Sequence, residues 1–525
     1  MKKLIPAFAL FILFSCQQQQ PFDIIIINGT LIDGTEAEPQ TADIAIVGDR
    51  IVRIGSLKGK EAKDTIDAFG LIVSPGFIDL HTHLEPLKVL PETQSHIMQG
   101  VTTALGGPDG SSPWPLGKYF KEIDSMGVGM NVGYLAGHNT IRRNTMGLEN
   151  RAPTIQELDS MKRQVEDAMK EGAFGLSTGL KYLPGTFSNV EEVIALSAVA
   201  AGHGGFYTSH LREEGLGLLD AVAEAIKIGK EADIPIVLTH HKVVGKPMWG
   251  NSSKTLAMVD EAVANGQDVM IDQYPYTASH TGIGILIPNW AKAGGSQAFR
   301  ERIENPGLRD SIKQGIIFNI INDRGGNDLN RVQFSRVSWN KDLEGKRLYD
   351  WVIAEGLEPT LENGAEMVIK AQLNGGANCI FHAMDEDDVK AIMKHPLTMI
   401  ASDGRLNKLG DGHPHPRAYS TFPRVLGHYS RNESVLPLNT AIYKMTGLPA
   451  KRMGLVDRGI IKEGNYADIT IFDAEKIIDK ATFLEPHQYP EGIIHVFING
   501  KASIRNGQFL NARNGVILYG PAKEK

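Results

Sequence analysis

The chain has 525 residues, of which 42% are hydrophobic and 22% are charged, and its formal net charge is −7. This is the composition of an ordinary globular protein, and the length is sufficient for a large buried core. The sequence contains no long run of basic residues, which argues against nucleic acid as a partner.

The first 20 residues have the features of an export signal. Two lysines precede a short apolar run that ends at Ser15 and Cys16, in MKKLIPAFALFILFSC. The run is too short for a resident membrane-spanning helix. The ending LFSC resembles a bacterial lipoprotein cleavage box, which predicts an exported lipoprotein, anchored to the membrane through a lipid on Cys16 and facing the periplasm. QQQQP would then be a polar tether. The alternative is a plain signal peptide cut near Ser15, which gives a soluble periplasmic protein.

Both ends of the remaining chain are rich in predicted strands. An Asn-Gly pair lies between two apolar runs at 28–29, in DIIIINGTLIDGT, and again at 499–500, in HVFINGKASIRNGQF. An Asn-Gly pair in this setting is typical of a β-hairpin. We therefore expect residues 21–73 and 435–525 to form one small β-sandwich together with a C-terminal segment.

Between the two ends, predicted strands and helices alternate. Helical patterns such as those at 154–172 and 217–232 separate many of the strands. The predicted strands are 77–83, 101–107, 131–138, 173–179, 205–211, 234–241, 268–274 and 397–404. Eight strands alternating with helices predict an α/β fold, a (β/α)8 TIM-like barrel, over residues 74–434. The long gap between the last two strands predicts an inserted subdomain at about 281–375.

Metal-capable side chains end several of these strands. His81 and His83 lie two residues apart in FIDLHTHLE, so they point to the same side of the first strand. His210 ends the fifth strand, His240 the sixth and Asp403 the eighth. Functional groups of such barrels gather at the carboxyl ends of the strands, so we expect the five side chains to converge. Imidazole and carboxylate ligands suit zinc, and the pattern predicts a zinc site.

A site with two zinc ions would need a bridging anion. The fourth strand ends in Ser177, Thr178 and Gly179, without the lysine that some barrels carboxylate for this purpose. Asp109, in GGPDG after the second strand, is the nearest alternative ligand. Pro-Asp-Gly is also a turn signature, so a purely structural role for Asp109 stays open. One or two zinc ions are therefore expected.

Several motifs together resemble the amidohydrolase superfamily and, within it, the D-aminoacylase (N-acyl-D-amino-acid deacylase) family. They lie in order between residues 75 and 473 and include PGFIDLHTH, GVTTALGG, GLSTGLKYLPG, YTSHLREEG, VLTHHKVVG, DQYPYTAS, ASDG and HPHPRAYSTFPRVLG. The resemblance implies a barrel beside a small β-sandwich built from both chain ends, with an insertion late in the barrel.

The resemblance also implies roles for the metal-capable residues. It implies His210 and His240 as ligands of the tighter zinc, His81 and His83 as ligands at a second position, and Asp403 as the catalytic acid and base. The family's D-aminoacylases usually carry cysteine in a GNCG segment where this chain has GPDG. Asp109 therefore stands in the place of a cysteine ligand, and a carboxylate binds a soft metal more weakly than a thiolate does.

Four further residues match the family's substrate contacts. Lys242, Tyr274 and Arg417 occupy positions similar to those that bind the substrate α-carboxylate, and Tyr182 a position similar to that of a contact to the amide or acyl oxygen. Without the resemblance, surface charges and core aromatic residues would be the simpler interpretation. The resemblance implies that the substrate is a small N-acyl-D-amino acid, a related N-acyl amino acid or a D-dipeptide. Metal-activated water would hydrolyse its amide bond.

Two alternatives stay open. One is a cyclic-amide hydrolase of the hydantoinase or dihydroorotase type, which the missing strand-four lysine disfavours. The other is a lipid-tethered binding protein on a catalytically decayed scaffold, which the complete set of metal-site residues disfavours. The stretch TASHTGIGILIPNW, after Tyr274, contains no lysine or arginine. This favours a neutral or hydrophobic substrate side chain.

Overall fold

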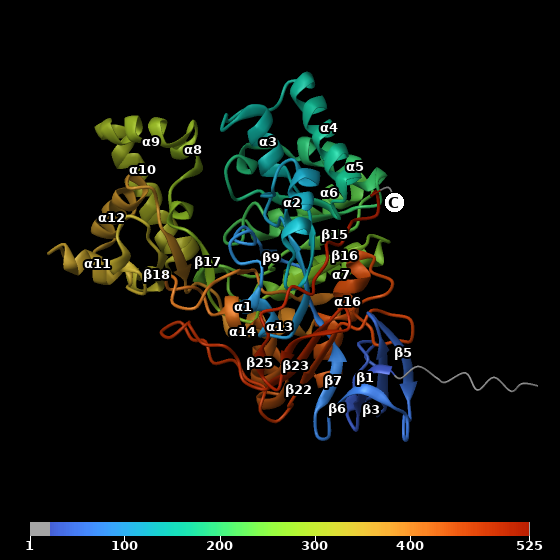
Figure 1. Ribbon diagram of the computed structural model, residues 1–525. Coiled ribbons are helices and arrows are strands. Elements are labelled where there is room, and N and C mark those ends of the chain that lie inside the picture. The colour runs from blue at the N-terminus through green and yellow to red at the C-terminus, as the bar shows by residue number, and fades with distance from the viewer. Residues whose placement is uncertain (1–21, 524–525) are drawn as a thin grey trace, which may run out of the picture.

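The computed structural model describes residues 22–523, so the predicted signal and Cys16 lie outside the described part of the chain. Within that part, no helix is both long enough and apolar enough to cross a bilayer. Figure 1 shows three regions, namely a central barrel, a β-rich region built from strands near both ends of the chain, and a helical subdomain to one side.

The barrel consists of eight parallel strands, as the sequence predicts. In chain order they are β8 (Phe77–Asp79), β10 (Val101–Gly106), β11 (Asn131–Tyr134) with its continuation β12 (Ala136–Gly137), β13 (Gly175–Gly179), β14 (Phe206–His210), β15 (Ile236–Leu238), β16 (Val269–Gln273) and β20 (Thr398–Ile400). Neighbouring strands along this order are paired in parallel register. Just beyond the last strand, β21 (Gly404–Arg405) pairs with β9 (Thr82–His83), which brings the end of the barrel back to its start. The predicted (β/α)8 fold is confirmed.

Helices cover the outside of the barrel (Figure 1). They include α2 (Leu116–Met126), α3 (His138–Met146), α4 (Ile155–Glu171), α5 (Val190–Gly202), α6 (Leu218–Ala232), α7 (Ser252–Ala264), α13 (Glu386–Lys394) and α15 (Leu438–Met445). The helix α4 shows why these boundaries arise. Thr154 and Glu157 form a reciprocal capping box at its start, and Gly172 adopts a left-handed conformation with φ 115° at its end. The predicted helices at 154–172 and 217–232 are thereby confirmed.

The β-rich region is a sandwich of two sheets. One sheet has the order β5-β4-β1-β6. Its strands are β1 (Phe22–Ile27), β4 (Asp43–Val47), β5 (Arg50–Gly55) and β6 (Ala62–Asp67). The other sheet joins N-terminal to C-terminal strands, because β7 pairs with β22. Its strands are β2 (Thr30–Leu31), β3 (Gln40–Thr41), β7 (Ile72–Pro75), β22 (Ile469–Phe472), β23 (Ile493–Ile498), β24 (Lys501–Arg505) and β25 (Gln508–Phe509). Buried side chains from both sheets, such as Ile44 and Phe497, form one core.

The two Asn-Gly pairs have different outcomes. The pair at 499–500 forms the predicted hairpin between β23 and β24, with φ angles of 51° and 73° that suit a tight two-residue turn. The hairpin predicted at 28–29 is wrong, because β1 pairs with β4 and β6 whereas β2 pairs with β3 and β7. This pair instead carries the chain from one sheet of the sandwich to the other.

The insertion between the last two barrel strands has its own sheet and core. Its sheet has the order β17-β19-β18, formed by β17 (Ser279–Gly282), β18 (Val332–Arg336) and β19 (Asn378–Phe381). Its helices are α8 (Asn289–Lys292), α9 (Gly295–Glu304), α10 (Pro306–Asn319), α11 (Leu348–Ala354) and α12 (Leu361–Leu373). The buried side chains Ile316, Phe334 and Cys379 belong to a hydrophobic cluster separate from that of the barrel. A π-helical turn, Ile320–Arg324, follows α10.

Candidate metal centre and active site

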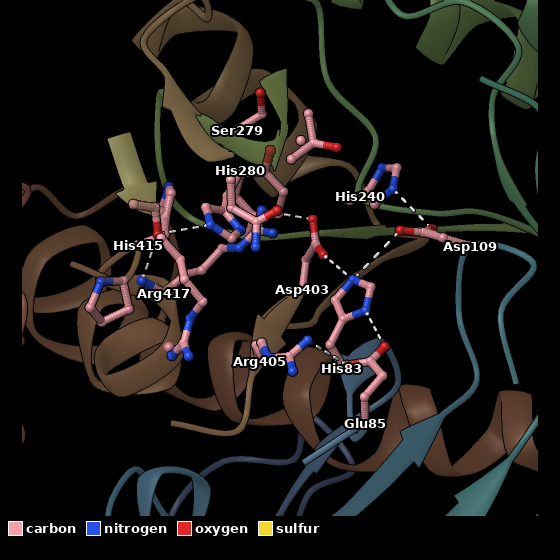
Figure 2. Close-up of a pocket in the computed structure, with 18 of the residues that line it drawn as sticks. His83, Glu85, Asp109, His240, Ser279, His280, Asp403, Arg405, His415 and Arg417 are labelled. Atoms are coloured by element: carbon pink, nitrogen blue, oxygen red, sulfur yellow. Dashed lines mark hydrogen bonds and ion pairs between the residues drawn. The ribbon is translucent and has the colours of Figure 1, made fainter. Parts of the chain in front are cut away.

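Four of the predicted site residues meet at the carboxyl end of the barrel. His81, His83, Asp109 and Asp403 each offer a ligand atom, and these atoms lie within 4.8 Å of one another. Nε2 of His83 lies 3.2 Å from Oδ1 of Asp403 and 3.6 Å from Oδ2 of Asp109 (Figure 2). Nε2 of His81 lies 3.6 Å from Oδ1 of Asp403 and 3.5 Å from Oδ1 of Asp109. The two histidines therefore face the same two carboxylates.

A second group of ligand atoms shares Asp109 with the first. Its members are Asp109, His210 and His240. Oδ1 of Asp109 lies 3.2 Å from Nε2 of His240 and 3.6 Å from Nδ1 of His210. Because one carboxylate belongs to both groups, Asp109 is placed to bridge two neighbouring metal ions.

The buried ring nitrogens test whether the residues present fit a metal. Nε2 of His81 and both ring nitrogens of His210 are buried without a hydrogen-bond partner among the described residues. Buried polar atoms are almost always paired, because an unpaired one retains its full desolvation penalty. A metal ion bound to His81 and to one ring nitrogen of His210 would remove that penalty at the atoms it binds. Four imidazoles and a shared carboxylate are donors that fit zinc or a similar divalent ion.

Three of the site residues have unusual backbone angles. The φ angles of Asp109, His240 and Asp403 are 52°, 35° and 47°. Residues other than glycine rarely adopt positive φ, and such positions cluster at functional sites where the surroundings enforce them. Two of the three are fixed through their backbone N–H groups, since that of His240 donates to Oδ1 of Asp272 at 2.5 Å and that of Asp403 to the carbonyl of His81 at 2.9 Å.

The electrostatic environment gives the residues different protonation states. Burial lowers the pKa of His210 to about 4, so its imidazole is neutral and can act as a ligand. Burial opposes the charged form of His81 as well, but Asp109 and Asp272 outweigh it and raise the pKa of His81 to about 10. Metal binding at His81 must therefore displace a proton.

Asp403 has a second contact outside the metal cluster. Its Oδ2 lies 2.7 Å from Nη1 of Arg417, while its Oδ1 faces His83 (Figure 2). Burial would raise the pKa of Asp403, but Arg417 and the neighbouring histidines hold it below its usual value. The carboxylate is therefore ionised at neutral pH and can accept a proton.

The four predicted substrate-binding residues line the same pocket as the metal cluster. The guanidinium carbon of Arg417 lies 4.7 Å, and Nζ of Lys242 lies 5.6 Å, from the centre of the Tyr274 ring. The ring of Tyr182 lies 4.5 Å from that of His210, between centroids. The ammonium of Lys242 donates to Glu214. Two cations and two aromatic rings thus surround the space beside the metal cluster.

The outer wall of the pocket comes largely from the inserted subdomain. Most of its side chains are polar, and they include His280, Arg324, Ser335, Arg336 and Asn378. The stretch directly after Tyr274 has no basic residue, as the sequence shows, but two arginines from further along the insertion reach the pocket. The part of the pocket wall that comes from the insertion is therefore mostly polar, and the sequence-based expectation of a neutral or hydrophobic substrate side chain stays a prediction.

Sequence reasoning missed the carboxylates behind the histidines. Glu85 lies 3.0 Å from Nδ1 of His83, Asp272 lies 3.8 Å from Nδ1 of His81, and Glu214 lies near both His210 and His240. Two of these were visible as short spacings, because Glu85 follows His83 by two residues and Glu214 follows His210 by four. Such partners orient metal-binding histidines.

Comparison with known proteins gives matches over nearly the whole chain. The sequence pattern of the Amidohydrolase family matches residues 64–504. The chain is 35% identical to a D-aminoacylase of Alcaligenes xylosoxydans xylosoxydans, covering 96% of this chain and 99% of the relative, and 34% identical to an N-acyl-D-glutamate deacylase of the same organism, covering 92% and 94%. The crystal structure of an N-acyl-D-glutamate deacylase from Bordetella bronchiseptica, complexed with zinc and a phosphonate inhibitor, has a TM-score of 0.82 at 32% identity and covers 95% of this chain and 100% of that one.

Proposed function

The chain belongs to the amidohydrolase family, in the group of D-aminoacylases and N-acyl-D-amino-acid deacylases, and we propose that it hydrolyses the amide bond of N-acyl-D-amino acids with zinc as cofactor. The products are a carboxylate and a free D-amino acid. The observation that carries this function is the convergence of two metal-ligand groups on Asp109, the first of which includes Asp403, in a pocket that also contains cations.

The metal and the side chains of the protein have separate roles in the proposed hydrolysis. Zinc held by His210, His240 and Asp109 would supply hydroxide near neutral pH and polarise the scissile carbonyl. Asp403 is ionised, and its Oδ1 faces the metal ligands. This oxygen takes the proton from the attacking water and passes it to the leaving nitrogen, as a general base and then a general acid.

The cations in the pocket bind the substrate's α-carboxylate. Arg417 presents a planar guanidinium, which can donate two parallel hydrogen bonds to a carboxylate. Lys242 adds a second positive charge near the same aromatic ring of Tyr274. Arg417 also contacts Asp403, so the carboxylate-binding and proton-transfer groups are adjacent. A substrate whose α-carboxylate is bound by Arg417 therefore has its scissile amide near Asp403, which carries the proton.

The cyclic-amide alternative has weaker support. The strand β13 ends without a lysine, and the hydroxyl of Ser177 donates to the carbonyl of Gly107 at 2.6 Å. No carboxylated lysine can therefore bridge two metals from this strand. The decayed-scaffold alternative has weaker support as well, because the predicted ligands meet in two groups that share Asp109.

A substrate panel tests the proposed function. Purified zinc-loaded protein should hydrolyse N-acetyl-D-amino acids faster than their L-enantiomers, and faster than hydantoin or dihydroorotate. N-acetyl-D-glutamate, -D-glutamine and -D-leucine in the same panel separate acidic, neutral polar and hydrophobic side chains. Preferential opening of the cyclic amides would favour the alternative, and a protein with stoichiometric zinc that hydrolyses no amide would contradict the enzymatic function.

We also propose that the protein is exported and anchored through a lipid on Cys16. The support is the LFSC ending of the apolar run. Cys16→Ser should release the protein from the membrane fraction or block its processing. Normal cleavage with an unchanged membrane distribution would contradict the lipid anchor, and a plain signal peptide would then be preferred.

A further inference from the structure

Glu214 lies behind both histidines of the second metal-ligand group. Its Oε1 is 3.3 Å from Nδ1 of His240, and its Oε2 is 3.6 Å from Nε2 of His210. The opposite nitrogens of the same two rings face Asp109, at 3.2 Å for His240 and 3.6 Å for His210. The His240 ring hydrogen-bonds to Asp109 and has Glu214 on its far side, and the His210 ring lies between the same two carboxylates without a hydrogen bond to either.

Glu214 is itself fixed by two cations. The ammonium of Lys242 donates to its Oε1, and Nη2 of Arg324 donates to its Oε2 at 2.6 Å. Nη1 of Arg324 also donates to the hydroxyl of Ser279 at 3.0 Å. Glu214, Lys242 and Arg324 are all at least 97% buried. Arg324 ends the π-helical turn of the inserted subdomain, so this side chain links the subdomain to the carboxylate behind the metal ligands.

We propose that Glu214 is a shared positioning residue for His210 and His240, and that Arg324 holds Glu214 so that the docked inserted subdomain becomes part of the metal centre. The inference rests on the proposed function in taking these two histidines as ligands of the tighter metal. A histidine that binds metal through one nitrogen carries its proton on the other. A carboxylate that accepts a hydrogen bond from that N–H group fixes the tautomer and the ring orientation and strengthens the ligand.

Here Glu214 has two oxygens for two such N–H groups. The ammonium of Lys242 lies 2.6 Å from Nδ1 of His240, which requires that nitrogen to accept. Metal bound at Nε2 of His240 would place the proton on Nδ1, and because two donors cannot share a hydrogen bond, the ammonium of Lys242 would then have to move away from Nδ1. Glu214 is the acceptor within reach of both, so it can accept a hydrogen bond from Nδ1 while keeping its contact with Lys242.

The test measures zinc binding without substrate. Metal-free protein is titrated with zinc in competition with a chromophoric chelator. Glu214→Gln should weaken the tighter site by about 10- to 100-fold, the usual effect of removing such a partner. Arg324→Met should weaken it less, and Arg324→Lys should recover part of the loss because it restores a cation. Glu213→Gln is the matched control, since Glu213 is the preceding residue, is partly exposed and pairs with Lys181 instead.

A second readout separates positioning from simple stabilisation. The visible spectrum of cobalt-loaded protein reports ligand geometry, and it should change in Glu214→Gln and Arg324→Met but not in Glu213→Gln. If Glu214→Gln leaves two buried cations that prevent folding, the double variant Glu214→Gln/Arg324→Met removes one of them and is compared with Arg324→Met alone. A folded variant without Glu214 that binds zinc with wild-type affinity and keeps the wild-type cobalt spectrum would overturn the inference. Failure to hydrolyse any amide would instead contradict only the proposed function.

Discussion

At the residue scale, Asp403 could be a turn former, a metal ligand or a proton carrier, and the sequence alone does not distinguish these roles. It precedes a glycine, as a turn former would, its φ is 47°, and its two oxygens have different partners. Oδ1 faces His83 in the first ligand group, and Oδ2 faces Arg417. The second group, which contains His210 and His240, does not include it. This separation predicts that the proton-carrying role of Asp403 can be removed without removing the tighter metal.

Asp403→Asn tests that separation. The amide keeps the size and the turn chemistry but cannot carry the proton. We expect kcat to fall by about 10²- to 10⁴-fold, the range for general acid–base catalysis, with zinc retained at the tighter site. Steady-state kinetics and metal analysis on one sample measure both. Loss of zinc in proportion to activity would make Asp403 chiefly a ligand, and normal turnover would rule out its role in proton transfer.

Asp109→Asn tests the bridge between the two ligand groups. Asparagine tolerates positive φ as aspartate does, so the turn should persist while the charge is lost. We expect metal content to fall to one ion or fewer per chain, because a neutral amide cannot bridge two cations. Asp109→Cys is the comparison, since the family's D-aminoacylases usually carry cysteine there, and it should retain the tighter ion. Unchanged metal content in Asp109→Asn would show that Asp109 is a turn residue.

At the scale of elements, the same dipeptide forms a hairpin at one end of the chain and a sheet-to-sheet crossing at the other. The local signal is identical, so the difference lies in which strands are available as partners. β24 pairs with β23 directly after the turn, whereas β2 pairs with β7 and β3 and not with β1. Turn chemistry therefore predicts that the chain bends, and long-range pairing decides what the bend connects.

Gly500→Ala tests the hairpin at 499–500. Gly500 has φ 73°, and a Cβ there would lie 2.1 Å from the carbonyl oxygen of Gly48. Gly48 has φ 60° and open space around it, so Gly48→Ala adds the backbone strain alone, about 1 kcal/mol. We expect Gly500→Ala to lower the free energy of unfolding by more than this control, as measured by urea denaturation. Equal losses in the two variants would show that the close approach to Gly48 is unimportant.

At the scale of the whole molecule, much of the architecture could be predicted because its signals are local. Apolar runs predict the barrel strands, and a histidine or aspartate at the end of a run predicts the rim of the barrel. Arg324 could not be predicted in this way. It lies in a polar segment of the insertion, 110 residues from Glu214, and only the packing of two separate cores brings the two together. The polar pocket wall was missed for the same reason.

Removal of metal should lower the stability of the folded protein as well as its activity. The described chain has one cysteine, Cys379, which is free and buried, so stability rests on the cores and on bound metal rather than on a disulfide. Ligand bound at 100 times its dissociation constant stabilises the folded state by about 2.7 kcal/mol. We expect a chelator to lower the Tm, zinc to restore it and a reductant to leave it unchanged, all at one scan rate because large proteins often unfold irreversibly. His210→Ala, which removes a ligand of the tighter ion, should respond much less to the chelator. If metal-free and zinc-loaded wild-type protein have the same Tm, the ligand groups do not bind metal tightly in the folded state.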